Sequence, residues 1–288
     1  MDRKICIITG GNAGIGKAAA VQIAQKVWHV IIACRSQERG EIALRDIKAQ
    51  SGSDAVVLMI VDMSSRASIR AFAADFTAKY DRLDVLIQNA AIFDISQKEA
   101  QFSDDGVETI WATNHLGPVL LTDLLLEKLK ASEQGRVISI ASKGLMVKRS
   151  LQIDLDDPEF RRKKFNATNA YYQSKRAQIM YTYWMAEKLR ETAVSINCIS
   201  VTAVKIDIAK YPDISRWMKW AYKLKSKFSL SPAEMAETYT WLATSDEVSQ
   251  ISGKQFDEKR KEVRSIKYTY QPENIENVMA LTMRYLGE

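Results

Sequence analysis

Short, almost wholly apolar runs alternate along the chain with longer segments in which apolar residues recur at helical spacing. Apolar, β-branched runs of about four to eight residues are typical of strands buried on both faces of a parallel sheet. The predicted strands are residues 5–9, 29–34, 55–61, 83–88, 136–141 and 194–200, with a short seventh strand at 255–256.

The segments between these strands predict helices, because their apolar residues follow a helical period. Alternation of strands and helices favours an α/β fold: a doubly wound, mainly parallel sheet of about seven strands with helices on both faces and right-handed crossovers. No Pro/Gly/Ser-rich linker interrupts the pattern, so we expect a single domain over residues 1–288. The predicted helices are residues 15–26, 38–49, 66–79, 107–130 and 168–191.

Two stretches depart from this alternation. Residues 143–167 form a long, charged stretch, which predicts a loop beside the functional site.

Residues 205–230 interleave aromatic side chains, Trp217 and Trp220 among them, with lysines. We favour a substrate lid whose aromatic residues exclude water from an apolar ligand. The alternatives are a peripheral membrane contact through 211–228 and a packed helix whose lysines cover its outer side.

Composition and charge exclude several classes of protein. Apolar residues make up 47% of the chain, enough for a sizeable core, but none of the apolar runs approaches the length of about 18 residues that spans a bilayer. No export or transit segment is recognisable, which predicts a cytoplasmic protein. The net charge of +6 is spread among many acidic residues. Because no groove-reading motif accompanies that charge, we expect no nucleic-acid partner.

Cysteine and histidine are too sparse for a metal centre. The three cysteines, Cys6, Cys34 and Cys198, lie far apart in apolar runs, which favours buried thiols. The two histidines, His29 and His115, lack a third ligand at a recognisable spacing. We therefore expect neither a metal site nor a histidine-based triad.

A glycine-rich loop follows the first predicted strand. Gly10, Gly14 and Gly16 suit a sharp turn whose backbone must approach a pyrophosphate, with Asn12 inside the turn and Ile15 beginning the next helix. The amino end of that helix directs its free N–H groups toward an anion. An ordinary strand–helix turn is the alternative.

The end of the second strand indicates which dinucleotide binds. NAD-binding domains carry an acidic residue there for the ribose 2′-hydroxyl, but this chain has Arg35 and Ser36, with no acid before Glu38. A guanidinium can pair with a 2′-phosphate through two hydrogen bonds. We predict NADP(H), held by Arg35 with Ser36, Asn12 and Arg39 assisting. Arg35 as a solvated surface charge is the alternative.

Tyr171 and Lys175 lie four residues apart on one face of a predicted helix. A nearby ammonium favours the phenolate, so the pair can serve as an acid and base, with an expected lowering of the tyrosine pKa. Ser142 follows the fifth predicted strand, where its hydroxyl can hydrogen-bond a substrate oxygen. Ser139 is the alternative serine.

In chain order, the glycine loop, an Asn-Ala segment, a helical asparagine, the strand-end serine and Tyr-x-x-x-Lys resemble the short-chain dehydrogenase/reductase family over almost the whole chain. Ile32-Ala33-Cys34-Arg35, Asn114-His115-Leu116-Gly117 and Ser252-Gly253-Lys254-Gln255-Phe256 resemble its retinol-dehydrogenase-like branch and the related light-dependent protochlorophyllide reductases. That resemblance implies a Rossmann-type fold, NADP(H) and an apolar carbonyl or alcohol substrate.

The resemblance also implies a role for each matching residue. Ser142, Tyr171 and Lys175 match the catalytic residues, and Asn114 matches the asparagine that holds a water in the family's proton relay. Lys175 also matches the residue that binds the nicotinamide ribose. The other matching cofactor residues are Gly10, Gly14, Ile15 and Gly16 at the pyrophosphate loop, Asp62 and Met63 at the adenine, Asn89, Ala90 and Ala91 beside the ribose, and Tyr171 and Val204.

One departure from the family pattern affects the nicotinamide end of the site. Val201-Thr202 stands where the family usually has Pro-Gly. We expect an NADP(H)-dependent oxidoreductase that interconverts an apolar ketone or aldehyde with its alcohol. The alternatives are an NADP(H)-binding sensor or scaffold without turnover and a light-dependent reductase of a tetrapyrrole. Related enzymes often form homodimers through their fifth and sixth helices.

Overall fold

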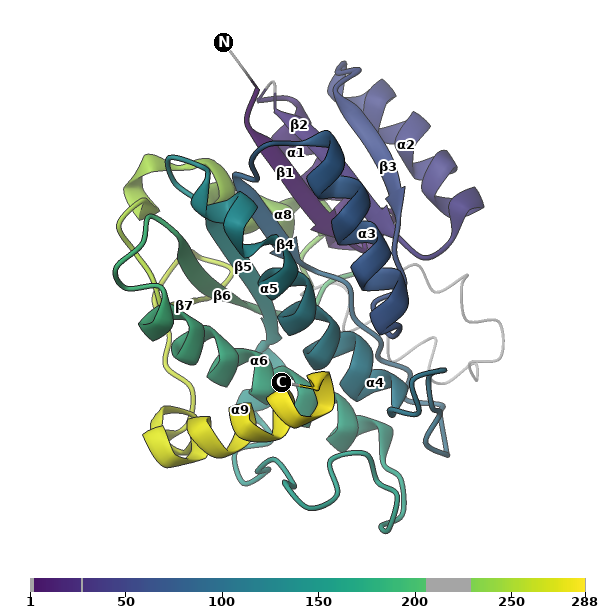
Figure 1. The fold of residues 1–288 in the computed structure, drawn as a ribbon, viewed down its shortest axis with the longest axis vertical. Helices are drawn as coiled ribbons and strands as arrows, with labels where there is room; N and C mark the ends of the chain where they lie inside the picture. Colours follow the sequence, from purple (N-terminus) through teal and green to yellow (C-terminus); the bar gives the residue numbers. More distant parts are fainter. Residues whose placement is uncertain (1–2, 27, 206–228, 288) are drawn as a thin grey trace.

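The computed structural model describes residues 3–26, 28–205 and 229–287. They contain a seven-stranded sheet in the order β3-β2-β1-β4-β5-β6-β7, and every pair of neighbouring strands is parallel (Figure 1). The doubly wound, Rossmann-type prediction is confirmed. The strands are β1 (Ile5–Thr9), β2 (His29–Cys34), β3 (Val56–Ile60), β4 (Val85–Gln88), β5 (Arg136–Ser142), β6 (Ser195–Val201) and β7 (Gln255–Phe256).

Helices cover both faces of this sheet because side chains of each strand alternate between two apolar cores. On β1, Cys6 and Ile8 face one core, whereas Ile5 and Ile7 face the other. The first core is completed by α1 (Gly14–Ala24), α2 (Gln37–Ser51) and α8 (Pro232–Thr244). The second is completed by α3 (Arg66–Lys79), α5 (Gly117–Lys130), α6 (Ala167–Lys188) and α9 (Pro272–Leu286), which lie in front of the sheet in Figure 1.

The strand order places a binding crevice at the carboxyl edge of the sheet. From β1 the chain proceeds outward through β2 and β3, then returns to the other side of β1 with β4. In open α/β sheets, ligands bind outside the carboxyl ends of the strands where the order reverses. The residues after β1, β4 and β5 are therefore the first candidates for a site.

The predicted helix over 107–130 forms from Thr109 to Lys130 and contains a π-helical turn. A short α4 (Thr109–Trp111) leads into a π-helical turn η1 (Ala112–Leu116), and α5 begins at Gly117. Pro118 lacks an N–H, so it cannot donate the α-helical hydrogen bond to the carbonyl of Asn114. Apolar periodicity predicted the helix, and Pro118 was the signal in the sequence for the π-helical turn within it.

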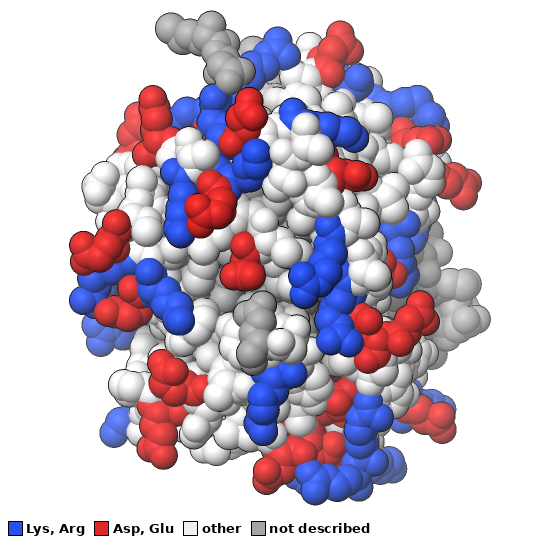
Figure 2. All heavy atoms as spheres, viewed as in Figure 1, with Lys and Arg blue, Asp and Glu red and all other residues white. Residues whose placement is uncertain are grey.

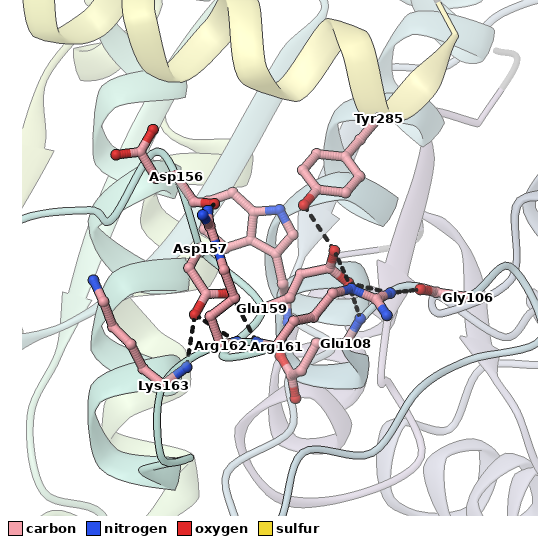
Figure 3. A network of polar contacts seen from close by, with 10 residues as sticks. Gly106, Glu108, Asp156, Asp157, Glu159, Arg161, Arg162, Lys163 and Tyr285 are labelled. Atoms are coloured by element: carbon pink, nitrogen blue, oxygen red, sulfur yellow. Dashed lines mark hydrogen bonds and ion pairs between the residues drawn. The ribbon is translucent and has the colours of Figure 1, made fainter.

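The charged stretch 143–167 begins with a short 3-10 turn, η2 (Lys143–Met146), and ends where α6 starts. Between them, charged side chains hold the loop in place (Figure 3). Asp157 accepts backbone N–H bonds from three consecutive residues, 161–163. Glu159 accepts hydrogen bonds from the Glu108 backbone at 2.7 Å and from the Tyr285 hydroxyl at 2.8 Å. These hydrogen bonds hold the loop against the start of α4 and against α9.

Most of the predicted lid, and all of the proposed membrane contact at 211–228, falls within 206–228, outside the described residues. The described ends of the lid lie side by side, because Lys205 donates a backbone hydrogen bond to Leu230 and Leu230 donates one to Ala203. Within the described ranges, none of the helices is long and apolar enough to cross a membrane. Lys and Arg alternate with Asp and Glu over the face shown in Figure 2.

Candidate active site

The glycine loop between β1 and α1 forms a turn that side chains would block. Gly10 has a φ of +66°, in the left-handed region that favours glycine. A Cβ on Gly16 would lie 2.5 Å from the amide nitrogen of Asn89 and 2.7 Å from the Gly10 carbonyl oxygen. Ala13 caps α1 without a side-chain hydrogen bond, which leaves the first N–H groups of that helix free for an anion. The loop therefore fits a dinucleotide pyrophosphate.

The segment after β4 braces this loop. Asn89 Nδ2 donates to the carbonyl of Thr9 at 2.9 Å and to that of Gly10 at 3.3 Å. The Ala90 backbone N–H donates to Thr9 Oγ1 at 3.0 Å. Ala91, at the same strand end, is exposed. The structure thus brings the Asn89–Ala91 segment against the glycine turn, at the edge where the ribose was expected.

Arg35 and Asp62 lie together beyond the carboxyl ends of β2 and β3. One Arg35 guanidinium nitrogen is 3.8 Å from Asp62 Oδ2, and the Arg35 side chain is 65% exposed. Such an exposed, long contact contributes little stability, so the guanidinium stays available to a ligand. Ser36 caps α2 by accepting the Arg39 N–H, and the Met63 side chain is buried in the core.

The structure separates the two candidate serines. Ser139 is fully buried and donates to Gln88 Oε1 at 2.7 Å, as part of a buried network with Thr122. Ser142, at the end of β5, lies close enough to the phenol of Tyr171 for its hydroxyl to lower the pKa of that phenol. Ser142 is therefore the serine that can share a substrate oxygen with the tyrosine, and Ser139 fixes β5 to β4.

Tyr171 lies in the first turns of α6, with its ring stacked on Phe93 at a centroid distance of 4.2 Å. Burial raises the pKa of Tyr171 to about 12, although the Ser142 hydroxyl acts to lower it. The expected lowering by the lysine was wrong, because desolvation of the phenolate outweighs the other effects. At neutral pH Tyr171 is protonated, and this form can donate a proton.

Lys175 is only 2% exposed, and its ammonium donates to the carbonyl of Ile140 at 2.8 Å. The Nζ atom lies 5.9 Å from the centre of the Tyr171 ring. Burial lowers the pKa of Lys175 to about 8, and the neighbouring Cys198 opposes this shift slightly. The lysine thus reaches the same crevice as the tyrosine, and its titration falls close to neutral pH.

Asn114 lies in the π-helical turn, and its side-chain amide is already engaged. Its Oδ1 accepts from the Ile92 N–H at 2.7 Å, and its Nδ2 donates to the Ile92 carbonyl and to Ser174 Oγ. Its main-chain carbonyl, which Pro118 leaves without an α-helical donor, is therefore the candidate group of Asn114 for holding a water. The spacing Asn-x-x-x-Pro was a signal for this feature in the sequence.

Phe93 is a site residue that no sequence motif indicated. It follows the Asn-Ala segment, is 43% exposed and stacks on Tyr171.

Val204, a predicted cofactor residue, lies just beyond β6 and forms an isolated bridge with Leu230. Val201, the first residue at the usual Pro-Gly position, is still part of strand β6 and is its last residue.

Replacing Lys175 with Met is expected to stabilise the fold at neutral pH and to lose this advantage at alkaline pH. A lysine in the unfolded chain titrates near about 10.4, above the folded pKa of about 8. Between these values the unfolded chain binds more protons, so the wild type gains about 3 kcal/mol of stability as the pH rises through this window. Urea unfolding at neutral pH and near pH 10 measures the difference.

The control for this experiment is Lys79→Met, at an exposed lysine that ends α3. Its stability difference from the wild type is expected to stay constant with pH. A Lys175→Met difference that is equally constant would contradict a buried ammonium at this position.

The short chain dehydrogenase family model matches residues 4–153, more than half of the chain. This match extends from β1 through the glycine loop and past Ser142 at the end of β5. The chain belongs to the short chain dehydrogenase family and is an oxidoreductase of this family, whose members use NAD(P)(H).

Among known proteins, the chain is similar to human retinol dehydrogenase 13, with 34% identity over 257 residues, 88% of this chain and 76% of that protein. Mouse retinol dehydrogenase 11 is 35% identical, covering 88% of this chain and 77% of the relative. A solved short chain dehydrogenase of Shigella flexneri, complexed with NADP, has the same fold, with a TM-score of 0.69 and 20% identity over 90% of this chain and 98% of that one.

Proposed function

We propose that this protein is an NADP(H)-dependent reductase of apolar ketones or aldehydes that also runs the reverse alcohol oxidation. The observation that carries this proposal is the cluster of Ser142, Tyr171 and Lys175 at the carboxyl edge of the sheet, next to the glycine loop. Similarity to retinol dehydrogenases over 88% of the chain supports an apolar substrate. The exposed Phe93 ring stacked on Tyr171 supports it too, because it offers an apolar surface beside the reacting group.

In this proposal each catalytic residue has a separate role in carbonyl reduction. When bound, the cofactor supplies the hydride. Ser142 and Tyr171 hydrogen-bond the carbonyl oxygen and share its developing negative charge. Tyr171 then donates its proton to that oxygen. Lys175, which titrates near pH 8, stabilises the phenolate until a water on the Asn114 carbonyl delivers a replacement proton.

The preference for NADP(H) rests on the arginine at the end of β2. A 2′-phosphate beside Arg35 gains charge-assisted hydrogen bonds that a hydroxyl cannot match. Asp62 lies close by, but the 3.8 Å separation leaves the guanidinium free to turn toward a phosphate. The exposed side chain of Arg39, in the first turn of α2, adds positive charge to the same edge.

A screen of apolar aldehydes and ketones, followed by NADPH and NADH absorbance, tests the proposed function. Turnover with NADPH in strong preference to NADH is expected. Tight NADPH binding without turnover of any carbonyl would instead favour a sensor or scaffold protein. This is the main competing function, because Val201-Thr202 replaces the usual Pro-Gly at the nicotinamide end of the site.

A further inference from the structure

A cavity of about 230 Å³ opens beside the catalytic serine, between the carboxyl ends of β5, β6 and β7. Ser142 and Ser200 line it at the strand ends. Its apolar walls are Leu145 and Met146 of η2 on one side, and Val263 and Ile266 on the other. Because Ser142 lines this cavity and also lies beside the Tyr171 phenol, a substrate whose carbonyl lies at the tyrosine can extend its apolar body into the cavity.

Two exposed arginines, Arg149 and Arg264, also line the cavity. Within residues 3–26, 28–205 and 229–287, neither forms an ion pair. Lys143 lines the same cavity, but its charge is matched by Glu258 at 2.7 Å. Asp257 also lines the cavity, and its negative charge offsets the positive charge of one arginine. The lining therefore carries an excess of about one positive charge, which complements a single negative charge.

The two walls that carry these arginines are held together. The Lys143–Glu258 ion pair joins η2 to the segment that follows β7. Behind η2, the fully buried Arg176 donates to the carbonyl of Lys148 at 2.9 Å and fixes the backbone next to Arg149. A guanidinium on a fixed backbone loses less entropy when it binds an anion.

We propose that the substrate is amphipathic: an apolar aldehyde or ketone with a carboxylate at its far end, which Arg149 and Arg264 bind while the carbonyl lies at Tyr171. This inference rests on the proposed function and narrows its substrate class. A carboxylate matches the single excess charge better than a phosphate dianion does. Guanidinium groups bind it through paired, charge-assisted hydrogen bonds.

The test compares azelaic semialdehyde, an aldehyde chain that ends in a carboxylate, with its methyl ester and with nonanal. With the wild type and NADPH, kcat/KM is expected to be highest for the acid. The double variant Arg149→Gln/Arg264→Gln is expected to lose about tenfold per arginine for the acid, equivalent to about 1.4 kcal/mol each, mainly through KM. Its kcat/KM for the ester and for nonanal should stay unchanged.

Arg45→Gln is the matched control, because Arg45 is an exposed arginine on α2, at the opposite edge of the sheet. It is expected to leave kcat/KM for all three aldehydes unchanged. Equal kcat/KM for acid and ester in the wild type, or an equal loss for both in the double variant, overturns the inference while leaving the proposed function intact.

If none of the aldehydes is reduced with either cofactor, the proposed function fails. The carboxylate site is then tested by ligand binding alone. Nonanoate, which carries no reducible group, is titrated into the full chain by calorimetry. Binding to the wild type but not to the double variant supports the carboxylate site. Equal binding to both proteins, or to neither, overturns it.

Discussion

Tyr171→Phe is expected to lower kcat for carbonyl reduction by about a thousandfold and to leave NADPH affinity within a few-fold of the wild type. The change removes one oxygen, the group that donates the proton, and keeps the ring that stacks on Phe93 at 4.2 Å. Because burial holds the Tyr171 pKa at about 12, the proton is present throughout the neutral range. Single-turnover kinetics with NADPH, together with NADPH binding by fluorescence, separate chemistry from affinity.

Tyr172→Phe is the matched control for this variant. Tyr172 is the next residue on α6, and its ring lies 6.4 Å from that of Phe93, so the two variants alter similar surroundings. Its kcat is expected to stay close to that of the wild type. If the two variants lose activity equally, the proton donor is another group and the assignment of Tyr171 fails.

The sheet and the site could be predicted largely because both depend on local signals. A buried parallel strand needs a continuous apolar run, so β1, β2 and β7 were predicted at their observed bounds. The glycine turn needs residues without a Cβ, as the short distances around Gly16 show. These requirements act within a few residues of chain and therefore leave a pattern in the sequence.

Two helices were missed even though their ends carry recognisable signals. Ser231 and Glu234 form a capping box at the start of α8. Pro272 begins α9, and Gly287 ends it in the left-handed conformation. In α9 the apolar residues recur at helical spacing as well, and Val278, Met279 and Leu286 are buried, so both its spacing and its ends indicated a helix.

Other features of the site depend on contacts between distant segments, which one sequence does not reveal. The pKa of Tyr171 depends on how deeply α6 is buried, and spacing to Lys175 could not indicate this. Ser139 and Ser142 look equivalent in the sequence, but Gln88 from β4 occupies the first. Arg149 and Arg264 meet at one cavity although more than a hundred residues separate them.

Arg35→Asp is expected to reverse the cofactor preference, with kcat/KM for NADPH falling by about a hundredfold. Two charge-assisted hydrogen bonds of roughly 1.5 kcal/mol each are lost, and the new carboxylate repels the 2′-phosphate. The same carboxylate can accept hydrogen bonds from the ribose hydroxyls of NADH, so kcat/KM for NADH is expected to rise. Steady-state kinetics with both cofactors and one shared carbonyl substrate measure the ratio.

Fold stability is expected to change little in this variant, because the Arg35–Asp62 contact is long and the arginine is 65% exposed. Arg45→Asp introduces the same charge change at an exposed position of α2, the helix that follows β2. If that control shifts the NADPH/NADH ratio as far as Arg35→Asp does, the effect comes from net charge alone. A ratio that stays at the wild-type value in Arg35→Asp removes this arginine from cofactor selection, because a 2′-phosphate beside a new carboxylate cannot bind with undiminished affinity.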